Sequence, residues 1–247
     1  VLGFGTVLLA LPLLPSKTRQ PVAIVDPDNC NGCSRCFADC PYAAITMTPH
    51  PNGHRGALLA QVDADLCASC GICAGACPSS TPFRSTLDLV SGIEMPQLSI
   101  ATLRLHLEQR LALRAAHRPI VVFGCREAAD SARIAGADVI VVSLLCAGQL
   151  APSFVEYALR EGAAGVLIAS CREGGCEFRL GARWTAERMR GEREPSLRAR
   201  VARDHVQLVC ADAGEETALA AALNAMRERL DRAGADGGTL RTTLHEH

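Results

Sequence analysis

A cysteine pattern that occurs twice decides the fold of this chain, first as Cys30-Asn-Gly-Cys33-Ser-Arg-Cys36-Phe-Ala-Asp-Cys40-Pro41 and then as Cys67-Ala-Ser-Cys70-Gly-Ile-Cys73-Ala-Gly-Ala-Cys77-Pro78. In each copy, two-residue gaps separate three cysteines, and a fourth follows after three residues and precedes a proline. Three thiolates within seven residues can curl round one face of a [4Fe-4S] cubane, whereas the fourth is directed away. The pattern therefore predicts two cubanes, each completed by the other copy.

Residues 20–80 resemble the ferredoxin-like modules that hold two such clusters. Short β-type runs, Val22–Asp26 and Ala43–Met47, flank the first copy, and Gln61–Asp63 precedes the second. We interpret the segment as an internal duplication. The expected ligands are Cys30, Cys33, Cys36 and Cys77 for one cluster, and Cys67, Cys70, Cys73 and Cys40 for the other.

Zinc and disulfides are the alternatives for these cysteines. Zinc ribbons pair two C-x₂-C motifs about 15–20 residues apart and do not place three cysteines at two-residue gaps. Thirteen cysteines in 247 residues are also too few for a small disulfide scaffold. The cysteine usage instead indicates a reducing compartment, and the formal charge of −1 argues against nucleic acid as a partner.

The first fifteen residues carry no charge. As a helix they would span about 22 Å, which is less than the roughly 30 Å of a hydrocarbon core. We expect residues 1–19 to be a truncated transmembrane stub, with Lys17 and Arg19 at the cytoplasmic face of the membrane. A soluble arm and a signal peptide are the alternatives, although no basic n-region or small-residue cleavage site is evident.

Residues 81–118 are expected to connect two domains. Apolar residues at spacings of three and four predict an amphipathic helix in this connector, ended by Pro119. Its apolar positions are Ile100, Leu103, Leu107 and Leu111.

From residue 119 to residue 234, apolar β-branched runs alternate with helical patterns, which predicts a parallel sheet with both faces covered. The predicted strands are 120–123, 139–142, 165–168 and 206–209. The predicted helices are 152–160, 184–190, 195–203 and 215–232, followed by a frayed tail at 235–247. The fold class is thus an α+β ferredoxin-like two-cluster domain followed by an α/β domain with a parallel sheet of about four strands covered by helices.

Four further cysteines lie at or near strand ends in the second domain. Because the carboxyl ends of parallel strands line one crevice, these side chains are expected to converge. Four thiolates suit a [2Fe-2S] cluster or a tetrahedral zinc ion, and the simpler alternative is that they are small buried apolar groups. The four are Cys125, Cys146, Cys171 and Cys176.

Residues 119–232 resemble the delta subunit of methyl-viologen-reducing hydrogenase, a domain that accompanies heterodisulfide reductases. The resemblance implies a [2Fe-2S] cluster that passes electrons to a flavin-bearing subunit like that of heterodisulfide reductase. It is carried by Phe123-Gly-Cys125, Cys146-Ala-Gly148, the run from Phe154 to Val166, Cys171-x₄-Cys176 and Glu187-Arg188.

The chain departs from that family pattern near the first strand of the second domain. The family often carries Cys-Cys-x-x-Cys there, whereas here Cys125 stands alone and Ala128 occupies the later position. Cys210 could substitute as a ligand, although a structural role is expected for it. His50 and His54 flank a predicted hairpin tip.

The sequence predicts an electron relay through two [4Fe-4S] clusters and one [2Fe-2S] cluster. Partners would be a hydrogenase or a flavin-bearing heterodisulfide-reductase-like subunit, and a membrane b-type cytochrome or quinone module if the stub is a membrane helix. No nucleotide-binding or hydrolase motif is present, so no substrate site is expected. The alternatives are a reductase that uses a cysteine of the second domain and a zinc-stabilised interaction module.

Overall fold

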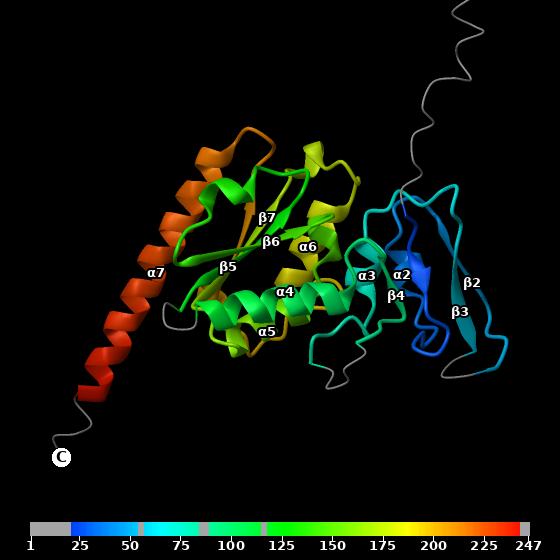
Figure 1. Ribbon diagram of the computed structural model, residues 1–247, viewed down its shortest axis with the longest axis horizontal. Helices are drawn as coiled ribbons and strands as arrows, with labels where there is room; N and C mark the ends of the chain where they lie inside the picture. Colours follow the sequence, from blue (N-terminus) through cyan, green and yellow to red (C-terminus); the bar gives the residue numbers. More distant parts are fainter. Residues whose placement is uncertain (1–20, 54–56, 84–88, 115–117, 243–247) are drawn as a thin grey trace, which may run out of the picture.

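The computed structural model places a small cysteine-rich region beside a larger α/β domain (Figure 1). It describes residues 21–53, 57–83, 89–114 and 118–242. The expected membrane stub at residues 1–19 lies outside these ranges. Among the described helices, none has the length and apolar character needed to cross a membrane.

Two antiparallel pairs of strands build the small region. Strand β1 (Ile24–Val25) pairs with β4 (Ile93–Glu94), and β2 (Ile45–Pro49) pairs with β3 (Leu58–Val62). The β2–β3 pair forms the predicted hairpin, with His50 just after β2. Because β4 comes from the expected connector and returns to pair with β1, this region extends beyond residue 80.

The two copies of the cysteine pattern adopt the same local backbone. Helix α2 (Arg35–Ala38) lies in the first copy and α3 (Ile72–Ala76) in the second. The residue before each helix has a left-handed conformation, with φ of 61° at Ser34 and 79° at Gly71. The internal repeat in the sequence is therefore also a repeat of backbone geometry.

The larger domain contains the predicted parallel sheet, whose strand order is β6-β5-β7-β8. All residues of the two central strands, β5 and β7, are buried, because helices cover both faces. The predicted fold class is thus confirmed. The strands are β5 (Ile120–Cys125), β6 (Val139–Leu144), β7 (Gly165–Ser170) and β8 (Val206–Cys210).

Three helices cover the sheet. Helices α4 (Ile100–Leu113) and α5 (Pro152–Arg160) contribute to the apolar cluster on one face, where Leu103 of α4 belongs to the same cluster as Phe123 of β5. Helix α7 (Glu216–Thr242) packs on the opposite face (Figure 1). The amphipathic helix of the expected connector therefore belongs to the larger domain.

The predicted helix at 195–203 is absent, and this segment is mostly irregular. It offers one apolar pair at helical spacing, Leu197 and Val201. Tertiary bonds hold the segment, because the Leu197 amide donates to the Arg188 carbonyl at 2.9 Å and the Arg198 amide donates to Glu156 at 3.3 Å. These bonds replace the hydrogen bonds that a helix would make.

Other boundaries differ by smaller amounts. Helix α6 (Gly181–Arg190) begins before Trp184, and α7 continues past the predicted end at Arg232, because no proline interrupts it. Four short 3₁₀-helices complete the described part: η3 (Ser131–Ile134), η4 (Ala147–Gln149), η5 (Glu173–Gly175) and η6 (Arg203–His205).

Helix α3 of the small region packs directly on η4 of the larger domain. A side chain at Gly75 would collide with the carbonyl oxygen of Gly148 and would come within 2.9 Å of the Gln149 backbone. Glycine is therefore required at position 75, because the two backbones touch there.

Gly75→Ala is expected to destabilise the protein by about 1–3 kcal/mol, which is the usual cost of forcing an extra methyl group into a packed interior. Urea unfolding of the anaerobically purified protein would measure this loss. Gly174→Ala is the matched control, since a Cβ at Gly174 would meet nothing within 4 Å. Equal stability of the two variants would contradict this account of the interface.

Candidate metal centres

The first predicted ligand set surrounds one cavity in the small region. Its four cysteines come from two distant segments, because Cys77 joins the three cysteines of the first copy. Counting all space not occupied by atoms, including space open to solvent, this hollow measures about 290 Å³. Its cysteine lining is Cys30, Cys33, Cys36 and Cys77.

The second predicted set surrounds a neighbouring cavity of about 330 Å³, measured in the same way. Here Cys40, from the first copy, completes the three cysteines of the second copy. Apolar side chains, including Ile72 and Met95, line the rest of the cavity. The cysteine lining is Cys40, Cys67, Cys70 and Cys73.

The backbone around both cavities is shaped for anions. Left-handed residues recur at matching positions, Gly32 and Ser34 in the first copy and Ser69 and Gly71 in the second. Alternation of left-handed and other backbone conformations can turn successive N–H groups into one concavity, as in many Fe–S sites. Ser34 and Ser69 adopt this conformation although serine disfavours it, so the surrounding structure must hold it.

Burial controls the protonation of these thiols. Desolvation, followed by repulsion from the other cysteines of its own set, raises the pKa of Cys36 to about 12. Desolvation likewise raises the pKa of Cys70 to about 11, and that of Cys73 well above its ordinary value. Bound iron would supply the positive charge that stabilises the thiolates, so the residues present fit a cationic cluster.

The two cavities are close neighbours. Cys36, which lines the first cavity, is among the groups whose charge raises the pKa of Cys73, which lines the second. These two cysteines occupy equivalent positions in the two copies of the pattern. Cys33, by contrast, is exposed to solvent, and marks an outer edge of the first cavity.

Four cysteines of the larger domain form a ring. The Cys125 and Cys171 sulfur atoms lie 3.8 Å apart. Cys125 and Cys176 each interact with both Cys146 and Cys171. The structure thus brings together the four predicted cysteines that follow or end three neighbouring strands.

Protons are shared unequally round this ring. Hydrogen bonds from Cys146 and Cys171 lower the pKa of Cys125 to about 3 and that of Cys176 to about 2. The same bonds raise the pKa of Cys146 and of Cys171. Each of these thiols therefore acts on the pKa of its neighbours, so the four cysteines form one electrostatic unit.

Backbone amides also point at the ring sulfur atoms. The Gly148 amide donates to Cys146 Sγ at 3.4 Å, and the Ala147 amide helps to lower the pKa of Cys125. Hydrogen bonds of this kind tune the potentials of iron–sulfur clusters.

Two other residues that the sequence singles out lie apart from these sites. Cys210 is exposed at the end of β8. Partial desolvation raises the pKa of its thiol, Arg172 acts to lower this pKa, and repulsion from Asp212 acts to raise it. His50 is hydrogen-bonded to the Pro27 carbonyl at 3.2 Å, so it has a structural role, and His54 lies outside the described residues.

Gly181, at the start of α6, closes the ring on one side. A Cβ there would collide with Cys146 Sγ and would lie 3.7 Å from Cys176 Sγ. No sequence pattern marks this glycine, because its requirement comes from a contact with a distant strand end.

Ile72 separates the second cavity from the ring. It is fully buried between Cys70 and Cys146 in one apolar cluster with Trp184. A Cβ on Gly148 would lie only 2.8 Å from the Ile72 side chain, so the two domains are tightly apposed here. The second cavity therefore adjoins both the first cavity and the ring.

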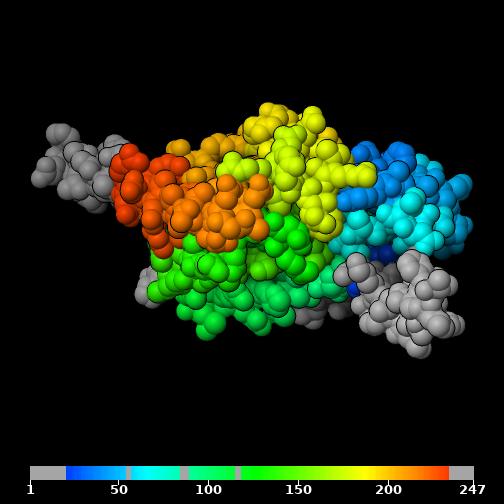
Figure 2. Space-filling view, turned by 90° about the horizontal axis from the view of Figure 1, so that it is seen from above, coloured from blue at the N-terminus to red at the C-terminus, as the bar shows by residue number. Residues whose placement is uncertain are grey.

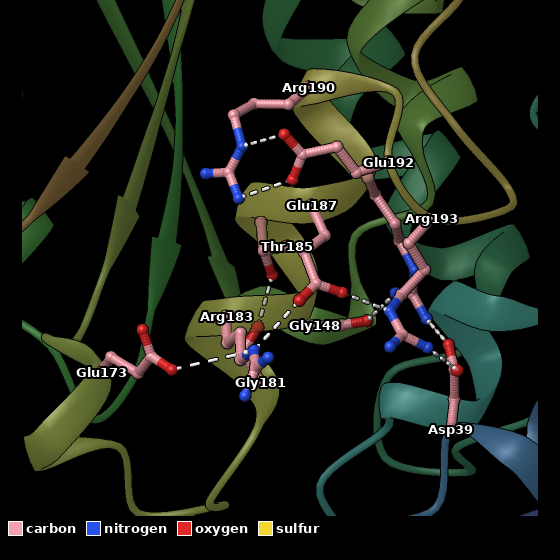
Figure 3. A network of polar contacts seen from close by, with 11 residues as sticks. Asp39, Gly148, Glu173, Gly181, Arg183, Thr185, Glu187, Arg190, Glu192 and Arg193 are labelled. Atoms are coloured by element: carbon pink, nitrogen blue, oxygen red, sulfur yellow. Dashed lines mark hydrogen bonds and ion pairs between the residues drawn. The ribbon is translucent and has the colours of Figure 1, made fainter.

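A buried ion pair crosses the same boundary. The Arg188 guanidinium, fully buried, donates to the Asp39 carboxylate and, at 2.9 Å, to the Gly148 carbonyl. Arg193 binds the other Asp39 oxygen at 2.7 Å and Glu187 at 2.6 Å, as Figure 3 shows. Because Asp39 precedes Cys40 and Gly148 lies two residues after Cys146, this network links the second cavity to the ring.

Further contacts support the boundary nearby. Arg179 donates to the Pro41 carbonyl at 3.0 Å, and its guanidinium lies 4.9 Å from the centre of the Tyr42 ring. In Figure 2 the yellow-green segment that contains Arg179 lies against the blue first copy of the pattern. Among the described residues, no group of three or more His, Cys, Asp or Glu side chains has the arrangement of a single-ion site.

Two cysteine-lined cavities within a duplicated small region define an iron–sulfur protein of the dicluster class. Consistently, residues 29–81 match the family model of the 4Fe-4S dicluster domain. Residues 120–234 match the family model of the methyl-viologen-reducing hydrogenase, delta subunit. The chain thus joins a dicluster iron–sulfur domain to a domain of the hydrogenase delta-subunit family, as the sequence predicted.

One similar protein is the F420-non-reducing hydrogenase vhc iron-sulfur subunit of Methanococcus voltae. The two are 39% identical over 41 residues, which is 17% of this chain and 28% of the relative. The match therefore spans little more than a quarter of the relative's length.

Gly181→Ala is expected to damage the ring while leaving the two cavities intact, because the added methyl group would occupy the position of Cys146 Sγ. Iron analysis after anaerobic reconstitution would detect the loss. Gly174→Ala is the matched control, since Gly174 lies in the loop between Cys171 and Cys176, yet a Cβ there would meet nothing within 4 Å. Full metal loading of the Gly181 variant would contradict this geometry.

Arg188→Met is expected to destabilise the protein by about 3–5 kcal/mol, because it leaves the Asp39 carboxylate buried with fewer partners. Arg190→Met is the matched control, since Arg190 lies on the same helix but pairs with Glu192 at the surface. Urea unfolding would compare the two variants. A loss of stability as small as that of the control would show that the buried pair does not hold the domains together.

Proposed function

We propose that this chain relays electrons through three iron–sulfur sites, of which the second adjoins the other two. The observation that carries the proposal is the placement of twelve cysteines in three groups of four, each predicted from the sequence and each gathered at one place. Iron–sulfur clusters supply one-electron redox chemistry when bound. The residues of the chain would bind the clusters, exclude water from them and tune their potentials.

In this proposal, Cys30, Cys33, Cys36 and Cys77 hold the first [4Fe-4S] cluster. Cys40, Cys67, Cys70 and Cys73 hold the second. The match to a dicluster domain supports both assignments, as does the grouping of the same cysteines around two cavities. Among the described residues that line these cavities, no histidine or acidic side chain competes with the cysteines as a ligand.

The third site is proposed to hold a [2Fe-2S] cluster on Cys125, Cys146, Cys171 and Cys176. One zinc ion held by the four thiols is the alternative, although no described group of His, Cys, Asp or Glu side chains has the arrangement of a single-ion site. Two observations favour the redox cluster: the match of the domain to hydrogenase delta subunits and the position of the ring directly beside the second cavity. A purely structural zinc ion would gain nothing from that position.

In this order, the first and third sites are the two ends of the proposed electron path, and the direction of electron transfer stays open. The first site has the exposed Cys33 at its edge, and the third has exposed residues in the Cys171–Cys176 loop. Ile72 and the network of Asp39 and Arg188 occupy the junction between the second and third sites. Electrons would enter at one end and leave at the other.

The partner at the third-site end is proposed to be a hydrogenase or a flavin-bearing heterodisulfide-reductase-like subunit. The name of the methanococcal relative, an iron-sulfur subunit of a hydrogenase, supports a complex of this kind. A b-type cytochrome or quinone module at the cytoplasmic face of a membrane is a further proposal. It rests on residues 1–19, which lie outside the described part.

Metal analysis combined with two serine variants tests the function. Two [4Fe-4S] clusters and one [2Fe-2S] cluster would give about ten irons per chain after anaerobic reconstitution. Cys176→Ser is expected to remove the [2Fe-2S] electron paramagnetic resonance signal and spare the cubane signals, because its thiol belongs only to the ring. Cys70→Ser is expected to reduce the cubane signals and spare the [2Fe-2S] signal.

Cys210→Ser serves as the control and is expected to leave every signal unchanged, because Cys210 is exposed and is not among the groups that shift the pKa values of the ring cysteines. About eight irons and one zinc ion in the wild type would replace the third cluster by a structural metal. A colourless, iron-free protein after reconstitution would reject the relay altogether.

A further inference from the structure

A large groove rich in arginine lies on the larger domain, away from the cysteine ring. It has a volume of about 900 Å³ and runs between α5 and the irregular segment before β8. Among its described lining residues, Glu156 is the acidic one. The basic lining residues, which we call the arginine groove, are Arg118, Arg160, Arg198, Arg200 and His205.

The arginine groove continues to the first cluster site. A second hollow of about 370 Å³ shares Thr81, Glu156 and Arg198 with it. That hollow is also lined by Cys77 and Pro78. Because Cys77 lines the first cavity as well, this hollow, whose charged lining residues are Glu156, Glu194 and Arg198, joins the arginine groove to the first cluster site.

Two buried polar atoms along this path lack hydrogen-bond partners. The Ser80 hydroxyl, whose residue is 1% exposed, makes no hydrogen bond. Oxygen Oε2 of the buried Glu156 makes none either, although Arg198 and Arg200 lie 3.4 and 3.6 Å from it.

The arginine groove carries more basic than acidic groups, although Arg160 pairs with Glu161 at 2.8 Å. Arg198 and Arg200 share a single carboxylate, that of Glu156. The whole chain has a formal charge of −1, so this concentration of guanidinium groups is a local feature. Such a patch attracts negatively charged partners and speeds their encounter.

We propose that the arginine groove is the docking surface for an acidic one-electron carrier protein that exchanges electrons with the first cluster beside Cys77. This inference rests on the proposed function only for the presence of that [4Fe-4S] cluster. The reduced cofactor of the partner gives one electron to the first cluster, so the cofactor is oxidised and the cluster is reduced. In the reverse direction, the reduced cluster gives one electron to the oxidised cofactor. No bond forms and no proton is required.

A protein fits the surface better than a small anion does. The side chains of Arg198 and Arg200 are 58 and 70% exposed, and Arg160, 57% exposed, lies 4.5 Å from the centre of the Phe83 ring, so the three form an open surface that does not enclose a small ligand. Electron-transfer encounters are typically small and guided by charge, which suits an open basic groove.

Stopped-flow reduction of the reconstituted full chain by flavodoxin hydroquinone, an acidic one-electron donor, tests the proposal. Arg160→Gln/Arg200→Gln is expected to lower the second-order rate at low salt about tenfold and to weaken its salt dependence. The control Arg133→Gln/Arg190→Gln removes two exposed arginines elsewhere, at 70 and 57% exposure, and should keep the wild-type rate. Reduction by dithionite should be equal in all variants.

Three results would overturn the proposal. The first is a wild-type rate in the groove variant. The second is that Phe37→Ala slows the reduction of the chain whereas the groove variant does not. Phe37 is 52% exposed near Cys33, so this result would place the docking surface there. The third is tight binding of inorganic phosphate that the groove variant abolishes, which would make the groove a small-anion site. Absence of any cubane signal in the wild type before mixing would instead reject the proposed function.

Discussion

The buried contact between Arg188 and Asp39 is the constraint on which the arrangement of the three sites depends. An isolated charge at this depth would be very costly, so each group requires the other. The pair also fixes position, because Arg188 binds the Gly148 carbonyl while Asp39 adjoins Cys40. One guanidinium therefore holds the loop of the ring against the second cavity.

Small residues make this close approach possible. Gly75 and Gly148 let α3 and η4 meet backbone to backbone, and Gly181 leaves room for the Cys146 sulfur atom. Electron relay requires short separations between redox sites, so the packing of these glycines and the proposed function share one physical requirement. Ile72 then fills the remaining space and keeps water out of the junction.

The surroundings of the first and third sites differ in chemistry. The first site adjoins a basic groove and has an exposed cysteine, whereas the ring is enclosed by strand ends, α6 and the small region. Different surfaces at the two ends would favour different partners, because charge and shape select which protein docks.

The sequence by itself determined the duplicated cysteine sets, the parallel sheet and the convergence of Cys125, Cys146, Cys171 and Cys176, because spacing and strand periodicity are local signals. Only the tertiary structure decided which sites adjoin one another, the Arg188–Asp39 pair and the need for glycine at position 181. Asp39 and Arg188 are 149 residues apart, and no local pattern pairs them. For the same reason the helix expected at 195–203 was wrong, since bonds to Arg188 and Glu156 outcompete a weak helical pattern.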